Sequence, residues 1–65
     1  MIASIEGNVT QILDDSVVIN VSGIGFKVYV TAEAARNAEL HRPIALFTHL
    51  VVREDALTLY GFESD

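Results

Sequence analysis

Hydrophobic and polar residues alternate along most of this chain, with the period of two that is typical of half-buried β-strands. The first predicted strand spans residues 2–13, and one of its faces carries the small and apolar side chains of Ala3, Ile5, Gly7 and Val9. A glycine in the middle of a strand weakens it. Gly7 therefore indicates a bulge or a sharp bend, as at the corner of a small barrel.

The same alternation predicts four further strands, which follow a turn at residues 14–16. They span residues 17–21, 26–31, 44–52 and 56–62, and Pro43 opens the fourth strand of the chain.

Two connections between these strands are informative. The alanine-rich residues 32–37 favour a short helix, for which Thr31 is the N-cap and Glu33 a favourable first-turn acid. Residues 22–25 contain two glycines, which indicate a special backbone conformation or the close approach of another segment. A phosphate-binding glycine loop would lead into a helix, whereas a strand follows here.

Five strands, with one short helix between the third and the fourth, predict an all-β fold. The architecture they match is the oligonucleotide/oligosaccharide-binding (OB) fold, a five-stranded Greek-key barrel. The length of 65 residues fits one small domain of this kind. An SH3-like small barrel is the alternative architecture, because the pattern of hydrophobic positions does not determine the order of the strands.

Size and composition limit the possibilities further. A chain of 65 residues buries only about 60% of its unfolded surface, and this one has no cysteine for disulfides or thiolate metal sites. Its stability must therefore come from its hydrophobic residues, which make up 51% of the chain. Because neither a membrane-spanning run nor a signal-peptide pattern is found, the sequence predicts a soluble intracellular protein.

The charge balance opposes unaided binding of nucleic acid. The formal net charge is −5, and the four basic residues are scattered along the chain: Lys27, Arg36, Arg42 and Arg53. Neutralisation of phosphates by basic side chains supplies most of the non-specific affinity for DNA. We therefore expect little DNA binding from this chain alone.

An aromatic surface for stacking bases is not predicted either. Tyr29 is the one aromatic residue expected to point outward, near Lys27, whereas Phe26, Phe47 and Phe62 are expected in the core.

Candidate catalytic and metal-binding residues are sparse. His41 and His49 lack the spacing of zinc ligands, and we expect His41 in a loop and His49 packed and hydrogen-bonded within a strand. The pair Asp14-Asp15 is more simply an exposed turn than a weak cation site. No serine has a histidine partner nearby in the sequence, so we expect no intrinsic enzymatic activity, no metal and no cofactor.

The most unusual segment is Arg53-Glu54-Asp55, which joins the last two predicted strands. Tight hairpin turns usually contain glycine or asparagine, whereas this one places two adjacent carboxylates at its tip. By itself, such a segment is most simply a solvated loop.

A family resemblance changes that interpretation. The run FTHLVVREDALTLYGF, residues 47–62, resembles a hairpin of the RuvA family, the Holliday-junction-binding subunits of the bacterial branch-migration complex. The opening Met1-Ile2 and the segment VSGIGF at residues 21–26 resemble the amino-terminal domain of the same family, in the same order and at similar spacing. The resemblance extends from residue 1 to about residue 62 and is thinnest over residues 31–42. It implies that residues 1–65 are the family's N-terminal OB domain.

The resemblance also implies a function and its partners. Members of the family assemble as tetramers, hold four-way junction DNA open and load the motor RuvB, which uses ATP, during DNA recombination and repair and the SOS response. This implies a non-catalytic, cytoplasmic bacterial subunit without a cofactor of its own. The family's helix-hairpin-helix DNA-binding domain and RuvB-binding domain are absent from residues 1–65.

For individual residues, the resemblance places the family's acidic pin on Glu54 and Asp55, at the centre of the tetramer where the DNA strands cross. Arg53 is expected to orient this pair or to offset its self-repulsion. The competing hypothesis is an OB or SH3-like module that binds a protein or assembles with itself and has no DNA role.

Overall fold

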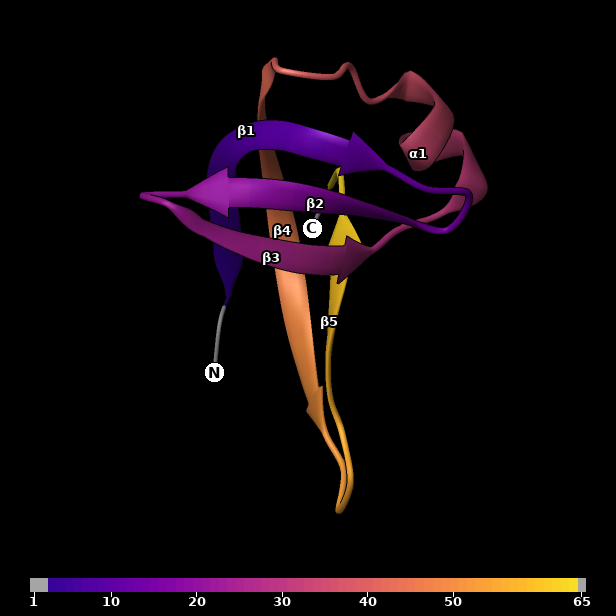
Figure 1. The fold of residues 1–65 in the computed structure, drawn as a ribbon. Helices are drawn as coiled ribbons and strands as arrows, with labels where there is room; N and C mark the ends of the chain where they lie inside the picture. The colour runs from indigo at the N-terminus through magenta and orange to yellow at the C-terminus, as the bar shows by residue number, and fades with distance from the viewer. Residues whose placement is uncertain (1–2, 65) are drawn as a thin grey trace.

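The computed structural model describes residues 3–64, and its five strands close into a barrel (Figure 1). The elements are β1 (Ser4–Ile12), β2 (Ser16–Val21), β3 (Ile24–Tyr29), α1 (Ala32–Asn37), β4 (Pro43–Val52) and β5 (Leu57–Phe62). Around the barrel the order is β1-β2-β3-β5-β4, and β4 closes back onto β1. All neighbours are antiparallel except β3 and β5, which are parallel. This is the five-stranded Greek-key arrangement of the OB fold, so the predicted fold is confirmed.

The predicted strand limits are correct to within a few residues, and the differences have local causes. Ser16 belongs to β2 and not to the preceding turn, and β3 begins at Ile24. That early start is possible because the turn between β2 and β3 uses only Ser22 and Gly23, with φ angles of 53° and 90°. Such left-handed angles at both central residues match the twist of a hairpin. Met1 and Ile2, on which part of the family resemblance rests, lie outside the described residues.

β1 turns a corner of the barrel near Gly7, as the sequence predicted. Up to Asn8 this strand pairs with β4, and from Asn8 onward it pairs with β2, with a bulge after Val9. A Cβ atom on Gly7 would overlap the backbone oxygen of Asn20, so β2 approaches too closely for any side chain. The absence of a side chain at Gly7 therefore allows β1 to pair with β4 along its first part and with β2 along its second part.

Aliphatic side chains from every strand fill the barrel. The buried cluster consists of Ile5, Val17, Ile19, Val28, Leu46 and Leu59. Ile5 and Val9 of β1 are buried, so the predicted apolar face of the first strand points inward. Outside this cluster, α1 packs against β2 with Ala35 buried, and the Ala34 N–H donates to the Thr31 hydroxyl at 3.1 Å, which confirms the predicted cap. No helix among residues 3–64 is long and apolar enough to cross a membrane.

The predicted core positions of Phe47 and Phe62 are wrong. These side chains are 46% and 49% exposed, whereas Phe26 is half-buried and packs against the core, as expected. In β4, Leu46 and Thr48 point inward, so the residue between them must point outward. Phe62 is its cross-strand partner and shares that outer face.

Candidate functional site

The charged segment lies at the end of a two-stranded ribbon that leaves the barrel. β4 and β5 stay paired from Phe47–Phe62 to Val52–Leu57, and the end of β4 and the start of β5 extend beyond the other strands (Figure 1). The apolar side chains of Val52 and Leu57 are 67% and 73% exposed. Their exposure shows that this part of the ribbon no longer covers the core.

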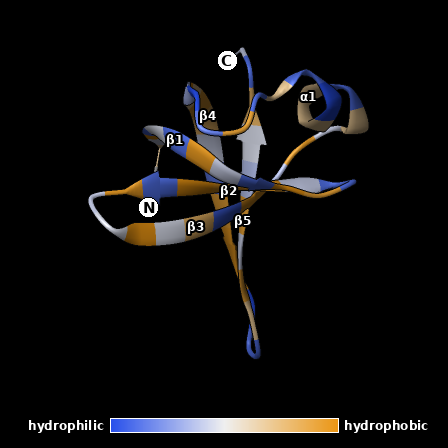
Figure 2. Ribbon diagram, turned by 45° about the horizontal axis from the view of Figure 1, so that its top comes forward, coloured by the Kyte–Doolittle hydropathy of each residue, from blue (hydrophilic) through white to orange (hydrophobic). Residues whose placement is uncertain are grey.

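Glu54 and Asp55 form the tip of this hairpin. The Arg53 N–H donates to the Ala56 carbonyl at 2.8 Å, which leaves two exposed acidic residues between the strands. The tip is one of the hydrophilic ends of the molecule in Figure 2. Neither acidic residue has a positive φ, so this turn needs neither glycine nor asparagine.

The two carboxylates are not neutralised by the neighbouring arginine. Arg53 is exposed, and within residues 3–64 no ion pair or side-chain hydrogen bond joins it to Glu54 or Asp55. Two unit charges about 4 Å apart repel each other by only about 1 kcal/mol in water, so an exposed tip tolerates both. The tip can therefore present two negative charges to a partner. Residues 53–56 include no serine, threonine, cysteine or histidine beside these carboxylates.

The remaining candidate residues do not gather into a second site. His41 lies in the loop before β4, as expected, but His49 is exposed on the outer face of β4, so its predicted packing is wrong. Asp14 and Asp15 lie in an exposed turn, where the Ser16 hydroxyl donates to the Asp15 carboxylate at 3.1 Å. Within the described part of the chain, no three histidine or acidic side chains lie close enough to hold a metal ion.

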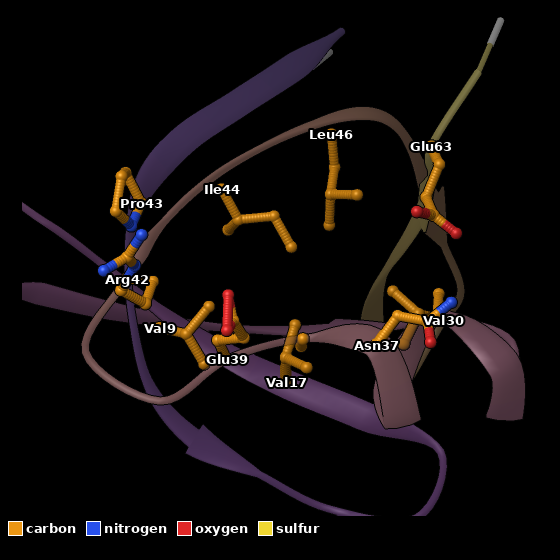
Figure 3. A pocket seen from close by; sticks show the side chains of 12 residues that line it. Val9, Val17, Val30, Asn37, Glu39, Arg42, Pro43, Ile44, Leu46 and Glu63 are labelled. Atoms are coloured by element: carbon orange, nitrogen blue, oxygen red, sulfur yellow. The ribbon is translucent and has the colours of Figure 1, made fainter.

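A small hollow lies between α1 and the end of the barrel (Figure 3). Its volume is about 190 Å³, below the 300–1,000 Å³ that is usual for ligand pockets. Val9, Val17 and Ile44 are among the apolar side chains that line it, and Glu39 and Arg42 contribute its charged groups. Its size and lining do not indicate a catalytic centre.

Tyr29 has an aromatic neighbour that the sequence pattern did not predict. Tyr60 pairs with it across the parallel β3–β5 contact, and the two ring centroids are 6.0 Å apart. Lys27 lies near Tyr29 as predicted, with its Nζ 5.2 Å from the ring centroid. The pairing joins residues far apart in the sequence, so no local pattern could have revealed it.

The fold and this hairpin define an OB-fold domain that carries a projecting acidic tip. The family model described as "RuvA N terminal domain" matches residues 1–61, and the chain belongs to this family. The predicted resemblance is thereby confirmed.

Three relatives illustrate the similarity, each described as Holliday junction branch migration complex subunit RuvA. The protein from Streptomyces coelicolor is 46% identical over 65 residues, which cover 100% of this chain and 32% of the relative. The protein from Micrococcus luteus is 48% identical over 62 residues, or 95% of this chain and 29% of the relative. The protein from Alkaliphilus oremlandii is 41% identical over 64 residues, which cover 98% of this chain and 33% of the relative. This chain thus spans about a third of the length of these relatives.

Proposed function

We propose that this domain helps a tetrameric, RuvA-type subunit to select four-way junction DNA, with Glu54 and Asp55 as an acidic pin at the centre of the complex. The observation that carries the proposal is the exposed carboxylate pair on a ribbon that projects from the barrel. Membership of the family supports it, since relatives are named as subunits of a Holliday junction branch migration complex. The role is non-catalytic and belongs to DNA recombination and repair in the bacterial cytoplasm. ATP is used by the partner motor RuvB.

A single pin would have little influence on DNA. One carboxylate about 6 Å from a phosphate is repelled by only ~0.7 kcal/mol in water. Physiological salt screens this further, over a Debye length of about 8 Å. A lone acidic turn on a monomer therefore discriminates poorly between DNA shapes.

Assembly around a fourfold axis multiplies the effect. Two carboxylates from each of four subunits would place eight negative charges around one point, and their summed repulsion of phosphate reaches several kcal/mol. Continuous duplex across that point would be disfavoured, while strands that diverge around it would be accepted. The pin would thus select shape through repulsion of the wrong ligand.

Arg53 has a supporting role in this proposal. Its guanidinium stands one residue before the pair and would offset part of the self-repulsion when four tips meet. The fixed backbone hydrogen bond between Arg53 and Ala56 would keep the tip in one conformation during assembly.

The direct test neutralises the pin without changing its shape. In a chimera, this chain replaces the matching region of the Streptomyces coelicolor relative, and Glu54→Gln with Asp55→Asn removes both charges. We expect the ratio of junction affinity to duplex affinity to fall by roughly tenfold, which corresponds to ~1.4 kcal/mol. Fluorescence anisotropy with a fixed junction and a linear duplex at one salt concentration measures both affinities.

The matched control is Glu6→Gln with Asp14→Asn, which removes the same charge from exposed positions outside the hairpin. If this control lowers the ratio as much as the pin variant does, general electrostatics explains the effect and the pin assignment fails.

The isolated chain is expected to bind neither duplex nor junction appreciably at physiological salt. Its net charge is −5, and four scattered basic residues cannot neutralise enough phosphates. A gel-shift titration checks this expectation. Sub-micromolar binding of the junction by the chain alone would show that folding or assembly creates a basic face.

A further inference from the structure

The projecting hairpin carries one basic side chain beside its acidic tip. Arg53 directly follows β4 and is exposed, and its backbone N–H donates to the Ala56 carbonyl at 2.8 Å. Among residues 3–64, no ion pair or hydrogen bond holds its guanidinium. The backbone at Arg53 is therefore fixed by the turn, while the charged end of its side chain is available to a group outside this domain.

The other three basic residues lie beside parts of the fold that they can stabilise. The Lys27 Nζ is 5.2 Å from the centroid of the Tyr29 ring. Arg36 lies in the last turn of α1, where a cation favours the carbonyl end of a helix. Arg42 lines the hollow between α1 and the barrel. Arg53 stands apart from these, because its ribbon has left the barrel at the end of the molecule opposite α1 (Figure 1).

Strand alternation places Arg53 on the outer flank of the ribbon. Leu50 packs against the core, so Val52, two residues further along β4, lies on the same inward side. Val51 and Arg53 then lie on the outer side. Across the turn Arg53 pairs with Ala56, whose methyl group is too short to cover it. The guanidinium thus stands on one flank of the hairpin end, directly next to the acidic pair.

A phosphate is treated differently at the tip and on this flank. At the tip both carboxylates repel it. On the flank, a guanidinium about 4 Å away attracts it as strongly as two carboxylates about 8 Å away repel it, because Coulomb energy falls as the inverse of distance. Paired N–H···O bonds from the guanidinium to the phosphate then make the contact favourable. The hairpin end can therefore accept a phosphate beside it while it repels one in front of it.

We propose that Arg53 binds a backbone phosphate of the DNA strand that turns away from the centre of the junction. This inference rests on the proposed function, in which Glu54 and Asp55 occupy that centre. A tetramer then makes four such contacts, one for each strand that passes a tip. Linear duplex has no strand that turns aside there, so the contact adds to the affinity for the junction alone. Arg53 is thus a specificity-determining residue that attracts the correct shape of DNA.

The salt dependence of DNA binding by the chimera tests this contact. Each phosphate that a basic side chain neutralises contributes about 0.9 to the slope of log affinity against log salt concentration. Arg53→Gln removes four contacts from a tetramer, so the slope for the junction should become shallower by about 3–4, whereas the slope for duplex should change by less than about 0.5. Fluorescence anisotropy with a fixed junction and a linear duplex, over a range of salt concentrations, measures both slopes.

Two further variants separate the contact from a general effect of charge. Arg36→Gln is the matched control, because it removes the same charge from an exposed position in α1, far from the hairpin (Figure 1). Its two slopes should equal those of the unchanged chimera. Arg53→Lys should keep most of the junction slope, since lysine also neutralises a phosphate. It should bind the junction several-fold more weakly, because an ammonium group lacks the paired hydrogen bonds.

A third comparison separates phosphate binding from the offset of repulsion within the pin. Glu54→Gln with Asp55→Asn removes that repulsion, so an arginine that only offsets it would become redundant. We expect Arg53→Gln to reduce the junction slope by the same amount, about 3–4, in this neutral background. The pin proposal concerns the ratio of junction to duplex affinity, and this one concerns the slope that depends on Arg53, so each can fail without the other.

Four results would overturn the proposal. An unchanged junction slope in Arg53→Gln would mean that the guanidinium contacts no phosphate. An equal reduction in Arg36→Gln would assign the effect to overall charge. A reduction that is lost in the neutral background would make Arg53 a partner of the carboxylates alone. Dissociation of the Arg53→Gln tetramer, measured by light scattering at the concentrations used for binding, would assign the residue to assembly.

Discussion

Replacing both Glu54 and Asp55 with lysine is expected to abolish the preference of the chimera for four-way junctions. Each subunit would change from two negative to two positive charges at the tip, so a tetramer would present eight positive charges where it had presented eight negative ones. Central repulsion would become attraction, because each added lysine can neutralise a phosphate. Linear duplex should then bind more tightly, and the ratio of junction to duplex affinity should fall by roughly a hundredfold, or ~2.7 kcal/mol.

The same binding measurements, repeated over a range of salt concentrations, check this result. Duplex binding by the lysine variant should depend more steeply on salt than binding by the unchanged chimera. The matched control is Glu6→Lys with Asp14→Lys, which adds the same charge to exposed positions outside the hairpin. The free energy of unfolding should change by no more than about 0.5 kcal/mol in either variant, since the positions are exposed. If the lysine variant keeps the junction selectivity of the unchanged chimera, Glu54 and Asp55 form an ordinary solvated turn and the pin assignment is wrong.

The hairpin that carries this proposal was predictable because its signals are local. Two runs of strand-forming residues flank three charged ones, and the observed turn lies between Arg53 and Ala56 as the sequence predicted. The capped helix at residues 32–37 was predictable for the same reason. In both segments the decisive contacts join residues only a few positions apart.

The orientation of β4 was less predictable because both of its faces are hydrophobic. Leu46 and Phe47 are neighbours, as are Leu50 and Val51, so alternation alone does not identify the inward face. The inward face of β4 is determined by its register in the closed barrel, because β4 pairs with both β1 and β5. The outward positions of Phe47 and His49 follow from that closure.

The contact between the Tyr29 and Tyr60 rings could not have been predicted from local pattern. It depends on the parallel contact between β3 and β5, which brings Tyr29 beside Tyr60 across about thirty intervening residues. Strand order is the property that hydrophobic alternation leaves open, and the contact between these two rings is a direct consequence of it. Residues that look isolated in the sequence can therefore lie side by side in the fold.

Gly7→Ala is expected to be among the most destabilising substitutions of its size in this chain. Its Cβ would overlap the backbone oxygen of Asn20 and approach the Ile19 side chain, so β1 and β2 would have to separate at the barrel corner. Overpacking of this kind typically costs 1–3 kcal/mol, and we expect about 3 kcal/mol because a backbone atom cannot rotate away. A domain of this length has only about 3–10 kcal/mol of stability in total.

Urea unfolding of the isolated chain, followed by circular dichroism, measures this loss, and the thermal midpoint should fall by about 12–24 °C. Gly25→Ala is the matched control, because the added Cβ would meet only a Val18 methyl carbon at 3.2 Å. A side chain can yield by a few tenths of an ångström, so this variant should lose less than about 1 kcal/mol. If the two variants unfold at the same urea concentration, the close approach of β2 does not restrict residue 7 to glycine. The corner of the barrel would then owe its shape to the bulge after Val9 instead.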